Sequence, residues 1–222
     1  MTPEDMSAKT AAPGEPGIAS LPPLRRDLAL IADMVQPESR VLDVGCADGE
    51  LLHFLWHAKH IDGRGIELSH TGVHACVSRG LSVIQGDADT DLTDYPDLSF
   101  DYAILSQTLQ ATRSPKDVLS NLVRIGRYAI VSVPNFGFWR VRLALLFRGR
   151  MPVTPNLPFS WFDTPNIHLC TISDLTALCA AMEIVIDRSL IMFRGGTARP
   201  MEPSPLANLV GESAIFLLKK AR

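Results

Sequence analysis

Hydrophobic and polar positions divide this chain into alternating strand-like and helix-like segments. Apolar, β-rich runs predict strands at Arg40–Gly45, Gly63–Leu68, Leu81–Gln85, Phe100–Ser106, Tyr128–Val133, Ile184–Met192 and Ser213–Leu218. Apolar residues at helical spacing predict helices at 24–35, 49–60, 69–79, 114–126 and 171–182. Near-continuous apolar strands separated by helices are typical of a parallel sheet covered on both faces. We therefore predict an α/β fold with one seven-stranded, doubly wound, mostly parallel sheet and an antiparallel last strand.

Short-range signals mark the ends of several predicted helices. Ser69 is a predicted N-cap, and Gly80 stands at the position where a helix commonly ends in a left-handed residue. Ser114-Pro115 places an N-cap residue before a proline at the first helical position. Thr171 and Asp174 resemble a capping box, with aspartate in place of the usual glutamate or glutamine.

Composition favours one globular domain. The 222 residues are 46% hydrophobic and 20% charged, which is enough to bury one sizeable core. Residues 1–20 are rich in Pro, Ala, Gly and Ser, so we expect a flexible tail before a domain over 21–222. We find neither a stretch of membrane-spanning length nor a secretory signal, and we expect a cytoplasmic protein without a membrane span.

Charge, cysteine content and histidine spacing limit the kinds of partner and metal site that we expect. A net charge of −3 argues against a nucleic-acid partner, which normally requires a basic surface. The four cysteines form no CxxC pair, so we interpret them as small buried residues in a reducing compartment. Histidine pairs four residues apart, such as His53 and His57, lack an acidic third ligand, and we predict no metal site.

The segment Val41–Glu50 runs from an apolar strand through a glycine turn into a helix. In an open α/β sheet, ligands bind beyond the carboxyl ends of the strands, so this turn lies where a ligand is expected. A dinucleotide site requires G-x-G-x-x-G, and counting from Gly45 that pattern needs glycine at Ala47 and Glu50. Neither position has glycine, and the Glu50 carboxylate would repel a pyrophosphate. NAD and FAD are therefore disfavoured.

The same turn resembles the first motif of class I methyltransferases, D/E-x-G-x-G-x-G, as Asp43-x-Gly45-x-Ala47-x-Gly49. The middle glycine is replaced by alanine. The resemblance implies a Rossmann-like class I methyltransferase fold that binds S-adenosylmethionine (SAM), with Asp43 holding the α-ammonium group of the cofactor. Gly45 allows the tight turn, and Gly49 is expected to allow helix and ligand to approach closely.

Further polar residues follow the next strands in the order that this fold requires. Glu67 ends the second strand roughly 20 residues after Gly45, where a carboxylate can accept hydrogen bonds from a ribose diol. Asp87 follows the third strand and resembles the residue that accepts the adenine amino group. The fourth strand ends at Ser106, which resembles the position that flanks the cofactor.

Two segments beyond the fifth strand carry distinctive chemistry. Phe136–Arg150 mixes large apolar residues with four arginines and no acid, which fits a lid, a partner-binding helix or, less well, a membrane-surface helix. We place a lid or partner insertion over 136–170. Asp163 and His168 precede a helix and either face the cofactor or only stabilise the turn. If the protein transfers methyl groups, Asp163, His168 and Gln107 are the candidate catalytic residues.

The sequence is similar, from about Leu24 to Met192, to the methionine biosynthesis protein MetW family. The resemblance is carried by Arg25–Leu28, by the cofactor motifs, by Leu105–Gln110, by Val133–Phe136 and above all by Asp163–Cys170, and the last two stretches are specific to the family. It implies a SAM-binding accessory protein that supports a homoserine O-acyltransferase, its suspected partner. The alternative is a SAM-dependent methyltransferase acting on a small-molecule acceptor, because fold alone does not settle function.

Overall fold

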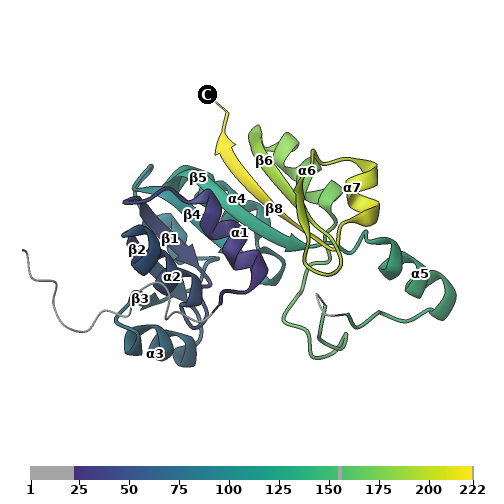
Figure 1. The fold of residues 1–222 in the computed structure, drawn as a ribbon, viewed down its shortest axis with the longest axis horizontal. Coiled ribbons are helices and arrows are strands. Elements are labelled where there is room, and N and C mark those ends of the chain that lie inside the picture. Colours follow the sequence, from purple (N-terminus) through teal and green to yellow (C-terminus); the bar gives the residue numbers. More distant parts are fainter. Residues whose placement is uncertain (1–22, 155–156, 222) are drawn as a thin grey trace, which may run out of the picture.

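The computed structural model describes residues 23–154 and 157–221, and one eight-stranded sheet forms the centre of this part (Figure 1). The predicted tail over 1–20 lies outside the described residues. The strands are β1 Arg40–Val44, β2 Asp62–Glu67, β3 Ser82–Gln85, β4 Phe100–Ser106, β5 Gly126–Pro134, β6 Ile184–Met192, β7 Ala198–Pro200 and β8 Ser213–Lys220. The α-helices are α1 Arg26–Met34, α2 Glu50–Lys59, α3 His70–Ser78, α4 Pro115–Ile125, α5 Trp139–Arg148, α6 Ile172–Ala181 and α7 Pro205–Val210. Short 3₁₀ helices lie at η2 Asp91–Asp94 and η3 Leu109–Ala111.

The strand order β3-β2-β1-β4-β5-β8-β6-β7 confirms the predicted doubly wound α/β fold. In this order the five strands from β3 to β5 are parallel to one another, whereas β8 is antiparallel to both β5 and β6. The described sheet has one strand more than the seven predicted, because β7 pairs with β6 over three residues only. So short a strand shows no periodic pattern in the sequence.

The core lies on both faces of the sheet, as the apolar strands predict. Leu42 and Val44 of β1 pack into a cluster that contains apolar residues of α4 and α6. Val41, whose side chain points to the opposite face of the sheet, packs into a second cluster with residues of α1 and α2. Successive side chains of a strand point to opposite faces, so both faces need apolar residues when both carry helices.

The predicted helix caps are largely confirmed. Ser69 accepts a hydrogen bond from the Gly72 N–H, and Gly80 has the left-handed φ of +77°. Thr171 and Asp174 form both hydrogen bonds of a capping box. Ser114 precedes a helix that begins at Pro115, but its side chain makes no cap bond.

One part of the chain leaves the sheet. Helix α5 and the segment after it extend as an arm beyond the end of β5 (Figure 1). A small apolar cluster of Phe138, Val141 and Leu157 holds the arm together, separate from the two main clusters. No helix in the described ranges is long and apolar enough to cross a membrane.

Candidate functional site

A pocket of about 320 Å³ opens beyond the carboxyl ends of β1 to β4. Its lining includes Gly45 after β1, Glu67 at the end of β2, Asp87 after β3, and Thr108 and Arg113 after β4. The chain runs outward in both directions from the β1–β4 junction, which is where ligands bind in doubly wound sheets. The volume falls within the range of small-molecule sites.

Glu67 is hydrogen-bonded to two turns that border this pocket, one after β1 and one after β2. Its Oε2 accepts a hydrogen bond from the Ala47 N–H at 2.8 Å, and its Oε1 accepts one from the Ser69 N–H at 2.8 Å. Each oxygen keeps a further lone pair, so the carboxylate can still accept hydrogen bonds from a ligand. The backbone bonds fix the orientation of the carboxylate before any ligand arrives.

Ala47 occupies the middle glycine position of the motif in a left-handed conformation, with φ of +51°. Its side chain is exposed, and its backbone oxygen accepts a hydrogen bond from the Cys76 thiol at 3.3 Å. A left-handed backbone disfavours any residue with a Cβ atom. The turn therefore keeps the glycine geometry although alanine fills the position.

Replacing Ala47 by glycine is expected to raise the free energy of unfolding by about 0.5–1 kcal/mol, because the strain of the left-handed Cβ is removed. Denaturant unfolding measures this. The matched control is Ala177→Gly on the exposed face of α6, which should lower stability by about 1 kcal/mol. Equal destabilisation by both substitutions would contradict the strain at Ala47.

Gly49 is closely packed against the protein interior. A Cβ atom at Gly49 would lie 2.5 Å from Leu81 Cδ1 and 2.9 Å from Cys76 Sγ, so glycine here lets the start of α2 approach Cys76 of α3 and Leu81. The expected approach of Gly49 to a ligand stays a prediction. Gly72 is a site residue that the sequence did not reveal. A Cβ there would lie 2.7 Å from both the Ala47 oxygen and Glu67 Cγ, so glycine lets α3 approach the two turns.

Asp43 is a buried carboxyl group close to Glu67. Its side chain lies on β1, the residue is 3% exposed, and no described lysine or arginine forms an ion pair with it. Burial, with a smaller contribution from the negative charge of Glu67, raises the pKa of Asp43 to about 7. A cation bound near this carboxyl group would favour its charged form.

Asp87 and Asp89 are bridged by Arg113, which sequence reasoning did not single out. The Arg113 guanidinium forms ion pairs with both carboxylates. The backbone N–H of Arg113 also donates to Asp89 Oδ2 at 2.8 Å. Asp87 Oδ1 also accepts a hydrogen bond from the Asp89 N–H. The end of the pocket assigned to adenine thus has one arginine between two carboxylates.

Residues after β4 form the wall beside Gly45. A Cβ atom on Gly45 would lie 2.8 Å from Thr108 Oγ1, and the backbone φ at Gly45 is +72°. Glycine at this position therefore allows both the close packing against Thr108 and the left-handed conformation. Thr108 Oγ1 donates to the backbone oxygen of Ser106, and the Ser106 and Ser132 hydroxyls lie 3.2 Å apart. Ser106 therefore supports this wall but is not itself part of the pocket lining.

The three candidate catalytic residues are not gathered around the pocket. The Gln107 side chain donates to Asp27 Oδ2 at 3.0 Å, and Asp27 also accepts two hydrogen bonds from Arg25. Asp163 and His168 are exposed, and neither belongs to the described lining of the pocket. Their catalytic role stays a prediction.

The segment that carries His168 is nevertheless attached to the pocket wall. The N–H groups of Ile167 and His168 both donate to the backbone oxygen of Gln110, at 3.0 and 2.9 Å. Gln110 belongs to η3, and the Gln110 side chain donates to the Gln107 backbone oxygen at 2.6 Å. The next residue, Ala111, lines the pocket.

Comparison with known proteins agrees with this geometry. The sequence profile of the family described as methionine biosynthesis protein MetW matches residues 25–218. The bifunctional methionine biosynthesis protein MetXA/MetW of Rhodopirellula baltica is 32% identical over 210 residues, covering 90% of this chain and 34% of that protein. The chain thus spans about a third of that relative's length.

Solved structures share the fold at low identity. A SAM-dependent methyltransferase of Thermotoga maritima, described as a possible histamine N-methyltransferase, has a TM-score of 0.64 at 17% identity, covering 88% of this chain and 91% of that one. A SAM-dependent methyltransferase of Archaeoglobus fulgidus has a TM-score of 0.61 at 16% identity, covering 87% and 94%.

Sheet order, glycine turn and structural neighbours together define the fold class of the class I SAM-dependent methyltransferases. Within that class the match extends over most of the chain in a single family. The chain belongs to the MetW family of methionine biosynthesis proteins.

Proposed function

We propose that this chain binds SAM in the pocket at the ends of β1 to β4 and, in the bound or free state, supports a homoserine O-acyltransferase in methionine biosynthesis. The observation that carries the SAM proposal is the row of carboxylates along three neighbouring strands, with Asp43 in β1, Glu67 at the end of β2 and Asp87 just after β3. SAM carries an ammonium group, a ribose diol and an adenine amino group, which are donors suited to such a row. When bound, the cofactor would supply a sulfonium methyl group.

The residues present fit this ligand. Asp43 is a buried carboxyl group with no cationic partner among the described residues. The ammonium group of SAM would be such a partner. Glu67 is held by two backbone N–H groups and keeps free lone pairs for a diol. Gly45 and Ala47 would support the turn, and Gly49 would hold α2 against α3 behind it.

Replacing Glu67 by alanine is expected to weaken SAM binding by about 1.5–3 kcal/mol, roughly 10- to 150-fold, because hydrogen bonds to a charged acceptor are lost. Titration calorimetry measures the change. The matched control is Asp62→Ala at the other end of the same strand, which should bind normally. Equal affinity of Glu67→Ala and wild type would remove Glu67 from the cofactor site.

The accessory role rests on the family. The Rhodopirellula relative carries both the MetXA and the MetW names in one chain, which supports a functional pairing of the two parts. As a downstream product of methionine, SAM would be a suitable signal for such a pair. The candidate catalytic side chains lie exposed or engaged elsewhere, which favours this role over the alternative of methyl transfer to a small molecule.

Co-purification with the homoserine O-acyltransferase tests the accessory role. We expect co-elution and a change in acylation rate when this chain is added, and a further change when SAM is present. Unchanged activity without co-elution would reject the role. Incubation with methyl-labelled SAM and a metabolite extract tests the alternative, and a labelled small-molecule product would favour it.

A further inference from the structure

The outward face of α5 is apolar, contrary to the usual pattern of a surface helix. Val141 is 2% exposed and packs inward against Phe138 and Leu157. The residues Trp139, Leu143, Leu146 and Phe147 recur at helical spacing on the other side and are 41–77% exposed. A helix normally buries its apolar stripe and exposes polar residues. This second apolar stripe is instead exposed to solvent.

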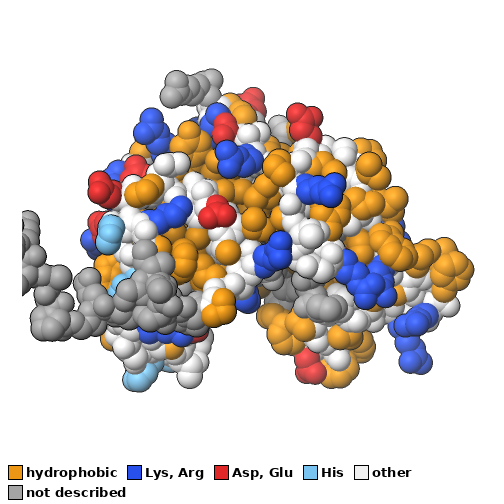
Figure 2. Space-filling model, in the orientation of Figure 1, with side chains coloured by type: hydrophobic (Ala, Val, Ile, Leu, Met, Phe, Trp, Pro, Cys, Tyr) orange, Lys and Arg blue, Asp and Glu red, His pale blue; other side chains and the backbone are white. Residues whose placement is uncertain are grey.

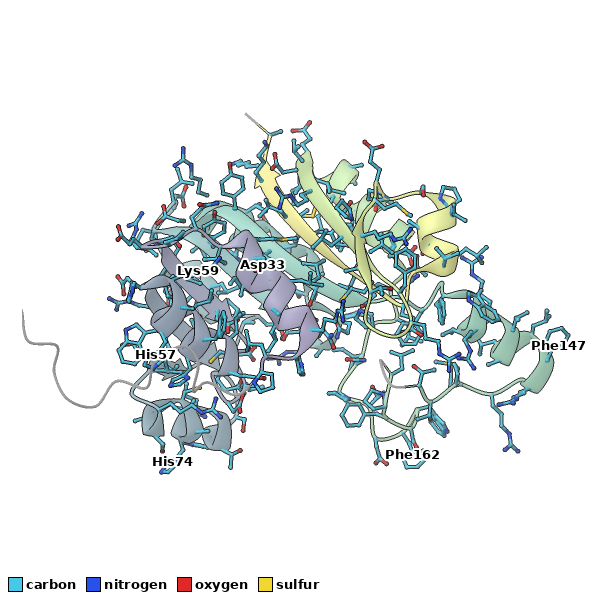
Figure 3. All side chains as sticks on the ribbon, in the orientation of Figure 1. Asp33, His57, Lys59, His74, Phe147 and Phe162 are labelled. Carbon is cyan, nitrogen blue, oxygen red and sulfur yellow. The ribbon has the colours of Figure 1, made fainter. Side chains whose placement is uncertain are left out.

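The segment that follows α5 extends the same kind of surface. Trp161 and Phe162 are 75% and 68% exposed, and their rings meet edge to face. Phe147 lies at the outer end of α5 and Phe162 on the neighbouring segment of the arm (Figure 3). Figure 2 shows apolar side chains gathered over the outer end of the arm with basic ones beside them. We name Trp139, Leu143, Leu146, Phe147, Trp161 and Phe162 the arm surface.

Positive charge surrounds the arm surface. Arg140, Arg142, Arg148 and Arg150 lie in a stretch from 135 to 162 without any aspartate or glutamate, although the whole chain has a net charge of −3. In the part of the chain that the structure describes, none of the four forms an ion pair with an acid. The Arg142 Nε donates to the Gly137 backbone oxygen at 2.6 Å, and the Arg140 guanidinium lies 5.9 Å from the Trp139 ring centre.

We propose that the arm surface is the docking site for the homoserine O-acyltransferase, on a face of that enzyme where an apolar groove is bordered by carboxylates. Helices enter protein grooves through apolar residues three, four and seven positions apart on one face, and those of α5 stand at i, i+4, i+7 and i+8. The arginine border calls for carboxylates on the partner. A second copy of this chain is the poorer occupant, because its arginines would face these ones across the interface. This inference rests on the proposed accessory role.

The arm surface is linked through the backbone to the wall of the cofactor pocket. The segment that carries Trp161 and Phe162 continues to Ile167 and His168, whose N–H groups bind the Gln110 carbonyl oxygen. The residues that follow Gln110 line the pocket. A partner held on the arm surface would therefore contact the segment that is hydrogen-bonded to one wall of the pocket.

Substitutions that place a charge on the arm surface test the proposal. The affinity of each variant for the acyltransferase is compared with that of the wild-type chain. Phe147→Glu and Phe162→Glu should each weaken the complex roughly 30-fold or more in a direct binding measurement, as expected for central aromatic contacts. The control Val77→Glu, on α3 at the far end of the sheet, is 57% exposed and should leave affinity unchanged. Unchanged SAM affinity and melting temperature would show that the arm variants remain folded.

The outcomes separate this inference from the role on which it rests. If wild type binds the acyltransferase and both arm variants bind equally well, the arm surface is not the docking site. If wild type does not bind at all, the accessory role fails and the docking site with it. Loss of self-association in sedimentation, or of binding to anionic vesicles, with the acyltransferase affinity intact would assign the surface to another occupant. Arg148→Glu should slow association at low salt, and an unchanged or faster rate would overturn the carboxylate border.

Discussion

Replacing Asp43 by asparagine is expected to weaken SAM binding at about pH 8 by on the order of 3 kcal/mol, roughly 100-fold, because a buried charge pair is lost. The wild-type affinity should itself rise with pH. Burial and the Glu67 charge raise the pKa of Asp43 to about 7, and a bound ammonium group would lower it, so binding below pH 7 must release a proton. The Asp43→Asn variant should lack this dependence near pH 7. Calorimetry in buffers with different ionisation enthalpies counts the released proton.

The same carboxyl group should make the stability of the free protein depend on pH. The folded pKa of Asp43 is about 7 against 3.8 for an unperturbed group, so the folded state binds more protons between these values. Its contribution therefore destabilises the fold increasingly as pH rises from about 4 to 7. The stability of Asp43→Asn relative to wild type should rise over that window by on the order of 3 kcal/mol. A constant difference would show that Asp43 ionises normally.

Replacing Asn135 by alanine is expected to destabilise the protein by about 4 kcal/mol. Asn135 is 2% exposed; its Nδ2 donates to the backbone oxygens of Asn208 and Gly211, at 2.8 and 2.7 Å. Its Oδ1 accepts from the N–H groups of Gly137 and Ile172, at 2.8 and 3.3 Å. Truncation leaves four buried backbone groups without this partner, each costing about 1 kcal/mol or more.

Thermal unfolding checks the expectation, and a loss of this size corresponds to a decrease of about 10 °C in melting temperature. Asn208→Ala is the matched control. Asn208 is also buried and lies in the same cluster, but its Oδ1 has no partner in the described structure, and its backbone oxygen remains available to Asn135. We expect little loss of stability in Asn208→Ala. Similar losses in both variants would show that packing, rather than hydrogen bonding, explains the result at Asn135.

Asn135 also explains part of the family pattern in physical terms. The stretch Val133–Phe136 is among the residues that resemble the MetW family most specifically. In the structure, Asn135 connects the end of β5 to the start of α6 and the end of α7. The asparagine thus holds the start of α6 and the end of α7 against the end of β5.

The sequence by itself determined the α/β alternation, the glycine turn at Gly45 and the cap of α6 at Thr171. Each depends on periodicity or on residues within a few positions of one another, so the physical cause is visible along the chain. The same reasoning identified Glu67 and Asp87, which line the observed pocket, because the carboxyl ends of parallel strands meet at one edge.

Only the tertiary structure decided which side chains are engaged and which are open. The bridge from Arg113 to Asp87, the Gln107 bond to Asp27 and the Asn135 contacts join residues far apart in sequence, and no local pattern encodes them. It also placed Gly49 against Leu81 and Cys76 and turned the apolar stripe of α5 outward. Helical periodicity shows that a stripe exists, but the direction it faces depends on where the helix packs.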